Sequence, residues 1–383
     1  MTPSQPEPVQ ATLANGVRVI AMPMPHLRTA SVSIFVRSGS AHETRRQSGI
    51  GHVVEHMVFK GTARRDSHQI NLDAERLGAE VNAHTDKDHS AFHMRGLGGD
   101  AVRFVAMLAD LVQQPTFPDE ELERERQVLL QEVAEVEDDP MATAYKLFDG
   151  ACYGLHPVAQ PVIGSRANIE RFTRDELAGW VRQQFTGANV LVAAAGGIDP
   201  QALVREVERA LGDMPRGEPH RVAPPQFTGG LRARRVPGSS QTHVVLGFPI
   251  PTLVDDDPAA EVAAALLGEG MSSPLMTELR ERRGLVYHAA CAADVLTCAG
   301  SSSSKPRSRR TSSTSCCAPW PACCMRRPVR PTRSTWNARS TSWRCAACAR
   351  KSGPAAAWKR PRWTGLRSAA CAHPPSAASV RVP

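Results

Sequence analysis

The alternation of apolar and polar residues predicts a series of strands and helices over the first 211 residues. Period-two alternation predicts strands over 16–21 and 30–36. A strand pair over 80–94 turns around Asp86 and Lys87, and an apolar strand covers 189–196. Apolar residues at three- and four-residue spacing predict helices over 48–59, 66–77, 100–113, 119–136, 175–185 and 200–211.

The periodic pattern of apolar residues is interrupted after residue 211 and resumes near residue 243. Residues 213–240 are rich in Pro, Gly and Arg without periodicity, which is typical of a linker. A strand over 243–248 and helices over 258–267 and 273–283 follow. The mixture predicts an α+β fold in which helices flank a mixed sheet, with a second, incomplete domain. The boundaries that we predict are 1–215 for the N-terminal domain, 216–240 for the linker, 241–299 for the second domain and 300–383 for an aberrant, disordered tail.

Charge and cysteine are distributed unevenly between these regions. The chain has 46 Lys and Arg against 38 Asp and Glu, a net charge of +8. Because 17 of the basic residues and none of the acidic ones follow residue 300, the first 300 residues carry a net −9. That part is an ordinary, mildly acidic globular chain. Seven of the ten cysteines also follow residue 300: Cys316, Cys317, Cys323, Cys324, Cys345, Cys348 and Cys371.

The last 83 residues lack the material for a core. Their only Ile, Leu, Val or Phe residues are Val329, Leu366, Val380 and Val382, too few to offset the entropy of ordering the chain. We interpret this segment as the product of a reading-frame error in a GC-rich gene. The alternatives are a basic nucleic-acid-binding tail or a cysteine-rich metal segment, although the Cys345-x-x-Cys348 pair has no convincing second pair.

The N-terminus and the hydropathy of the chain bear on location. Residues 1–10 are polar and have no basic start followed by an apolar run, so we expect no signal peptide. No stretch reaches 18 uncharged apolar residues, so we expect no membrane span. The sequence therefore predicts a cytoplasmic protein.

The predicted helix over 48–59 carries the clearest chemistry. His52 and His56 lie one turn apart and can present ring nitrogens to one point, with Glu55 close to that point. The pattern His-x-x-Glu-His is an inverted zinc-peptidase signature, but a catalytic zinc needs a third protein ligand. The alternative is an amphipathic helix with a polar outer face. Its apolar stripe consists of Ile50, Val53, Val54, Met57 and Val58.

The segments around this motif carry a family resemblance. Gly39, the run from Gly49 to Thr62 and the distal stretch 125–132 together resemble the pitrilysin/insulinase family of zinc metalloendopeptidases, which includes the mitochondrial processing peptidases. One departure is Gly51, where the family usually has Ser, Thr or Ala. The resemblance covers residues 8–299. It implies a two-domain α/β roll in which 1–215 is the catalytic domain and 241–299 begins a homologous one.

The resemblance also implies roles for the site. Glu132, 76 residues after His56, would be the third ligand of a Zn²⁺ cofactor held by His52 and His56. Glu125 would orient a ligating histidine from the same helix face. Glu55 would act as the general base toward the attacking water. The alternative for both helix acids is a solvated, glutamate-rich face.

Further residues match by the same resemblance. Asn82 and Ala83 lie in a segment that resembles the edge strand to which a substrate peptide adds. Arg280 would hold the substrate backbone and Tyr287 would stabilise the oxyanion; the alternative is a basic helix end followed by a strand. Short family members often obtain this pair from another subunit, which implies a homodimer or a heterodimer with a related subunit.

Three functional hypotheses follow. The first is a zinc metalloendopeptidase acting on peptides or unfolded proteins, with no nucleic-acid partner. The second is a non-catalytic partner or assembly subunit on the same fold, and the third is a member of this lineage inactivated by its tail. The remaining cluster of His84, His89 and His93 has no metal-site spacing and is interpreted as surface histidines.

Overall fold

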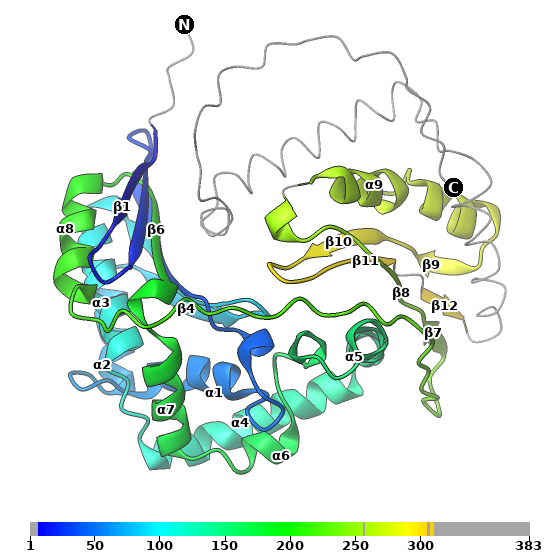
Figure 1. The fold of residues 1–383 in the computed structure, drawn as a ribbon, viewed down its shortest axis with the longest axis horizontal. Coiled ribbons are helices and arrows are strands. Elements are labelled where there is room, and N and C mark those ends of the chain that lie inside the picture. The colour runs from blue at the N-terminus through cyan, green and yellow to red at the C-terminus, as the bar shows by residue number, and fades with distance from the viewer. Residues whose placement is uncertain (1–6, 256, 305–306, 310–383) are drawn as a thin grey trace, which may run out of the picture.

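The structure, a computed structural model, describes residues 7–255, 257–304 and 307–309 (Figure 1). The predictions about residues 310–383, including the reading-frame interpretation and its alternatives, lie outside the described residues. The predicted domain boundaries at 215, 240 and 299 stay predictions. No helix in the described ranges combines the length and the apolar character that a membrane span requires.

A six-stranded mixed sheet forms the framework of the N-terminal region. Its order is β1-β2-β6-β3-β5-β4, in which β2 and β6 run parallel and the other neighbours pair antiparallel. The predicted mixed sheet is therefore confirmed, and β4 lies at its edge. The strands are β1 (Val9–Thr12), β2 (Arg18–Pro23), β3 (Thr29–Val36), β4 (Glu80–Thr85), β5 (Ser90–Leu97) and β6 (Val190–Gly196).

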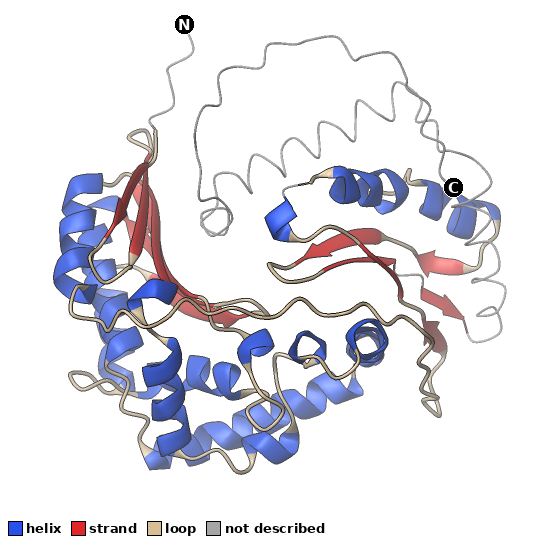
Figure 2. Ribbon diagram, viewed as in Figure 1, coloured by secondary structure: helices blue, strands red, loops and turns tan. Residues whose placement is uncertain are grey.

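Helices cover one face of this sheet and enclose the main core with it (Figure 2). Val19 and Ile34 from the strands and Phe104 and Leu108 from α3 are fully buried in this core. The helices of this region are α1 (Ile50–Met57), α2 (Ser67–Arg76), α3 (Ala101–Gln113), α4 (Asp119–Asp138), α5 (Pro140–Tyr153), α6 (Arg166–Ile169), α7 (Arg174–Gln184) and α8 (Pro200–Leu211).

Two of these helices, α5 and α6, escaped the sequence analysis. The local signal for α5 is a cap rather than a periodic stripe: the Asp139 side chain accepts the amide of Met141, and Pro140 occupies the first turn. α6 is a single short turn, begun by Ser165, whose hydroxyl accepts the amide of Asn168. Both helices follow α4 and help to position it.

The second region is smaller and its sheets are short. One sheet has the order β10-β11-β8 and another β7-β12-β9, with α9 lying over β10 (Figure 1). The predicted helix over 273–283 is a π-helix over Met276–Arg282. The other elements are β7 (Gln241–His243), β8 (Leu246–Pro249), α9 (Ala259–Gly268), β9 (Val286–His288), β10 (Cys291–Val295), β11 (Gly300–Ser304) and β12 (Arg307–Arg309).

The first residues of the predicted tail differ from the expectation of disorder. β11 pairs antiparallel with both β10 and β8, and β12 pairs with β7 and β9. Backbone pairing of this kind needs no apolar side chain, so a segment without an apolar pattern can still form strands. The periodicity criterion could not detect it.

The two regions meet through the turn between β10 and β11. The backbone N–H of Thr297 donates to the Asp88 carboxylate at 2.7 Å. Beside it, Lys87 pairs with Asp149 of α5 at 2.7 Å. The turn thus attaches the second region to α5 and to the turn between β4 and β5. A small apolar cluster adds to the contact: Ala41, Phe148, Cys152, Tyr153, Val158, Leu296, Cys298 and Ala299. Helix α5 also contacts β7 and β8.

Candidate metal centre

Helix α1 is short; one of its faces packs against the core and the other carries polar side chains. It begins after Gly49, whose φ of +98° suits glycine, and a Cβ there would come within 2.8 Å of the Gly164 backbone. The predicted apolar stripe is buried against the core, while His52, Glu55 and His56 remain partly exposed on the other side. The stripe residues, all 0–2% exposed, are Ile50, Val53, Val54, Met57 and Val58.

The buried carboxylate of Glu43 caps the start of α1. Its two oxygens accept the amide protons of Gly49 at 2.7 Å and Gly51 at 2.9 Å. These are amides that a helix N-terminus leaves without intrahelical partners, and the helix dipole favours an anion there. A Cβ at Gly51 would lie 3.0 Å from Glu43 Oε1, so glycine leaves room for this contact. Burial nevertheless raises the pKa of Glu43 to about 7, against the lowering effect of the two amides.

Helix α4 brings carboxylates to the exposed face of α1. Leu122, Leu129 and Val133 face the core. The Arg126 guanidinium donates to the carbonyls of Ile169 and Phe172, which ties α4 to the segment that contains α6. This orientation buries Glu125 and leaves Glu132 partly exposed two turns further along the same face.

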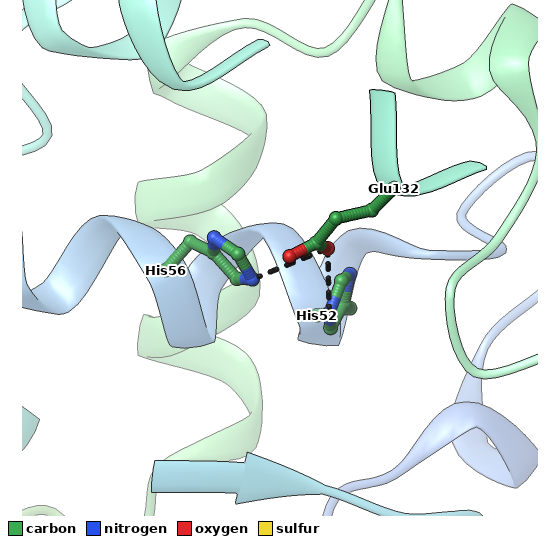
Figure 3. Close-up of side chains that lie close together, drawn as sticks. All are labelled: His52, His56 and Glu132. Atoms are coloured by element: carbon green, nitrogen blue, oxygen red, sulfur yellow. Dashed lines mark ion pairs between the residues drawn. The ribbon is translucent and has the colours of Figure 1, made fainter. Parts of the chain in front are cut away.

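Three side chains from these two helices converge (Figure 3). Glu132 Oε2 lies 3.7 Å from His52 Nε2 and 3.7 Å from His56 Nε2. The potential ligand atoms of all three residues lie within 4.8 Å of one another, and no other such group was found among the described residues. Ligand atoms about 2.0–2.1 Å from a tetrahedral zinc ion are about 3.4 Å apart, so the two 3.7 Å separations are near the spacing that the metal requires.

The hydrogen bonds of His56 suit a metal ligand. Its Nδ1 lies 2.8 Å from Glu125 Oε1, and the other Glu125 oxygen lies 2.5 Å from Lys60 Nζ. Although burial alone would raise the pKa of Glu125, hydrogen bonds from Lys60 and His56 outweigh it and hold the pKa below its ordinary value. An ionised carboxylate only accepts, so His56 Nδ1 donates to Glu125 and Nε2 is the ring nitrogen that faces Glu132. The sequence analysis missed Lys60; its position four residues after His56 was the available signal.

Among the described residues, His52 and Glu55 each carry a buried polar atom without a hydrogen-bond partner. Burial lowers the pKa of His52 to about 4, with a smaller contribution from the charge of His56. The His52 ring is therefore neutral near pH 7 and able to bind a metal. Within the described parts of the chain, neither His52 Nδ1 nor Glu55 Oε2 has a hydrogen-bond partner. Because a buried polar atom is seldom left unpaired, the free carboxylate oxygen is suited to hold a proton-bearing ligand.

Edge strand β4 carries Asn82 and Ala83. The Asn82 side chain is exposed and its Oδ1 accepts the Ala83 amide at 2.8 Å. Because β4 pairs only with β5 in the described sheet, its other edge is open to a further strand. α1 contacts this strand, so the open edge runs beside the helix that carries the histidines.

The histidines of the β4–β5 hairpin do gather. The His84 ring lies 5.5 Å from the His89 ring and 5.9 Å from the His93 ring, centroid to centroid. Burial lowers the pKa of all three. They do not form a three-ligand group among the described residues. The interpretation of these residues as surface histidines stays a prediction.

Arg280 and Tyr287 lie together in the second region. The Arg280 guanidinium carbon is 5.4 Å from the centre of the Tyr287 ring, and Tyr287 is 74% exposed. The other contacts of Arg280 are with Met271 and Glu281 of the same region. In the part of the chain that the structure describes, no interaction joins this pair to His52, His56 or Glu132. The predicted roles of Arg280 and Tyr287 stay predictions.

Two family models match the chain between residues 18 and 301. Residues 18–166 match the insulinase family of peptidases (M16), and residues 171–301 match the domain described as the M16 inactive domain. A Mycobacterium bovis protein named an uncharacterized zinc protease is 35% identical over 305 residues. The match covers 76% of this chain and 68% of that protein.

Two further similarities concern subunits and fold. The beta subunit of the mitochondrial processing peptidase of Lentinula edodes is 31% identical over 264 residues, covering 69% of this chain and 54% of that subunit. A crystal structure of a protease from Helicobacter pylori superposes with a TM-score of 0.80 at 19% identity. That alignment covers 92% of this chain and 87% of the other, and it supports the same fold.

The buried Glu43 leads to a prediction about pH and stability. Its folded pKa of about 7 lies above the ordinary 4.5, so the folded state binds a proton that the unfolded state releases between these values. Stability from this group is full below pH 4.5 and is lost as the pH rises through 7. Relative to Glu43→Gln, wild-type protein should lose about 1.4 kcal/mol per pH unit in this window, about 3 kcal/mol at most.

Urea unfolding of metal-free protein at a series of pH values measures this difference. Glu135→Gln, which removes an exposed carboxylate, is the control and should give a curve parallel to wild type. Equal pH dependence of wild type and Glu43→Gln would show that the folded protein does not raise the pKa of Glu43.

Proposed function

This chain belongs to the insulinase family of peptidases, M16, and on that premise we propose that it is a zinc-dependent endopeptidase. The observation that supports the proposal is the convergence of His52, His56 and Glu132 within 4.8 Å. Two imidazole nitrogens and a carboxylate oxygen are a known donor set of catalytic zinc sites, which use three protein ligands and leave one position open. These three residues would hold the metal.

Side chains of the protein would transfer the proton and orient the metal ligands. When bound, zinc supplies a Lewis acid that polarises a peptide carbonyl and acidifies a water molecule. Glu55, on the same helix face, takes the proton from the attacking water and delivers it to the departing amide nitrogen. Glu125 accepts from His56 Nδ1 and fixes the direction in which the ring nitrogen points.

The open edge of β4 suits an extended peptide. We propose that substrate adds as a further strand there, so that backbone hydrogen bonds bind it without regard to sequence. The Ala83 amide, now bonded to Asn82 Oδ1, would then donate to a substrate carbonyl. Peptides and unfolded segments fit this mode because they can become extended.

A subunit arrangement is favoured by the position of Arg280 and Tyr287. Arg280 contacts Tyr287, Glu281 and Met271, all in the second region, and one relative is named as a subunit of a processing peptidase. We therefore propose that a second copy or a related subunit supplies this pair to the metal site. The alternatives remain a non-catalytic partner or assembly subunit on the same fold and a member of the lineage inactivated by its tail.

Replacing the proposed base tests the chemistry. Glu55→Gln should lower kcat/KM for an unstructured peptide by about 10²- to 10⁴-fold, since general-base catalysis contributes a factor of this order. Zinc content should be unchanged because Glu55 is not a proposed ligand. Peptide cleavage and metal analysis on the same preparation measure both quantities, and a fully active variant would refute the proposed role.

A matched pair of helix acids tests the third ligand. Glu132→Gln should weaken zinc binding by on the order of 100-fold, because one of three protein ligands loses its charge. Glu135→Gln alters an exposed acid on the same helix and should leave the affinity unchanged. Competition with a chromophoric chelator measures both affinities. Equal affinity in the two variants would exclude Glu132 as a ligand.

Mixing two inactive variants tests the subunit proposal. Glu55→Gln retains the pair in the second region, whereas Arg280→Ala retains the complete metal site. In a two-fold dimer with free exchange between subunits, half of all dimers would be mixed, and each mixed dimer would contain one complete site out of two. About a quarter of wild-type activity should therefore return. Activity that stays at the level of the separate variants would indicate that the pair acts within one chain or not at all.

A further inference from the structure

Lys60 ends a chain of contacts that starts at the metal-binding group. His56 Nδ1 lies 2.8 Å from Glu125 Oε1, and Lys60 Nζ lies 2.5 Å from Glu125 Oε2. The side chains of His56, Glu125 and Lys60 are only 18%, 10% and 26% exposed. His56 and Lys60 belong to one continuous helical segment, because the 3₁₀ helix Val58–Lys60 extends α1. Glu125 reaches them from α4.

Both oxygens of Glu125 depend on this segment. A carboxylate removed from water is tolerated only when paired and hydrogen-bonded. Lys60 supplies the compensating charge on one oxygen, which leaves the other free to accept from His56. Without Lys60, Glu125 would retain a buried oxygen that lacks its cation, and the carboxylate would turn toward solvent and away from His56.

His52 and His56 differ in the hydrogen bonding of their Nδ1 atoms. Within the described residues, His52 Nδ1 has no hydrogen-bond partner, whereas His56 Nδ1 is held by Glu125. Of the two histidine rings in the metal-binding group, the ring of His56 is therefore the one whose orientation a hydrogen bond fixes. We propose that Lys60 is a positioning residue of the metal site: it holds Glu125 in place so that His56 Nε2 stays directed at the point shared with His52 and Glu132. This inference rests on the proposed zinc site.

A purely structural role is the competing explanation, since Lys60 also ties α1 to α4. Arg65 offers a matched control. It is likewise 26% exposed and pairs at 2.6 Å with Asp110 of α3, a carboxylate only 5% exposed. Removing either cation takes the nearest charged partner from a buried acid and should lower stability, although Asp110 keeps the Thr62 hydroxyl and a 3.9 Å contact with Arg64. Only the loss of Lys60 should also weaken metal binding.

The test measures zinc affinity of the full chain by chelator competition, without substrate. Lys60→Met should weaken binding about 10-fold, the lower end of the effect expected when the partner of a ligating histidine is disturbed. Lys60→Arg keeps the charge and should restore most of the affinity, and Arg65→Met should bind zinc like wild type. In a Glu125→Gln background, Lys60→Met should have no further effect.

Each outcome decides the inference. Wild-type affinity in Lys60→Met, or equal losses in Lys60→Met and Arg65→Met, would overturn it. If Lys60→Met does not fold, Lys60→Gln carries the same expectation. Because no peptide is cleaved in this assay, an inactive chain that binds zinc would refute the proposed function and leave the inference intact. A wild-type chain without zinc affinity would overturn both.

Discussion

Helix α1 must bury one face completely while its other face presents His52, Glu55 and His56, and it has only eight residues for both. Isolated helices of this length are unstable in water, so packing and end contacts have to fix it. The apolar stripe supplies the packing. Glu43 binds the amides at the start, and the Glu125–Lys60 pair holds the segment just past the end. The geometry of the candidate site depends on this restraint at both ends.

Much of the N-terminal fold was accessible from periodicity because its elements are amphipathic. The stripe of α1 and the alternation of β3 both correspond to buried positions in the structure. Helix α5 lacked a comparable stripe and was missed, although Asp139 and Pro140 marked its start. Strand order was out of reach, since the pairing of β3 with both β5 and β6 joins segments far apart in the chain. Strands β11 and β12 could not be predicted from apolar residues either, because backbone hydrogen bonds pair them with their neighbours.

The residues of the candidate site that lie close together in the sequence could be predicted from spacing, whereas those on distant elements could not. The pair His52 and His56 follows from helical spacing alone, whereas Glu132 was accessible only through family resemblance. Nothing in the α4 sequence distinguishes Glu132 from its acidic neighbours. What selects it is the rotation of α4, set by Leu129 in the core and by Arg126 on the carbonyls of the α6 segment. Glu43 was missed because it contacts backbone amides that sequence spacing does not reveal. Spacing placed Lys60 one turn after His56, but its partner Glu125 comes from another helix.

The pKa values of the two carboxyls that fix α1, Glu43 and Glu125, are shifted in opposite directions. Burial dominates at Glu43 and raises its pKa to about 7, whereas cationic and hydrogen-bonding partners dominate at Glu125 and lower its pKa. A buried carboxylate beside the ligands needs a cation to remain an acceptor. At Glu43 the two backbone amides offset the effect of burial only in part, and the pKa of its carboxyl is raised to about 7. The charge of Lys60 is thus placed where the orientation of His56 requires an ionised acid.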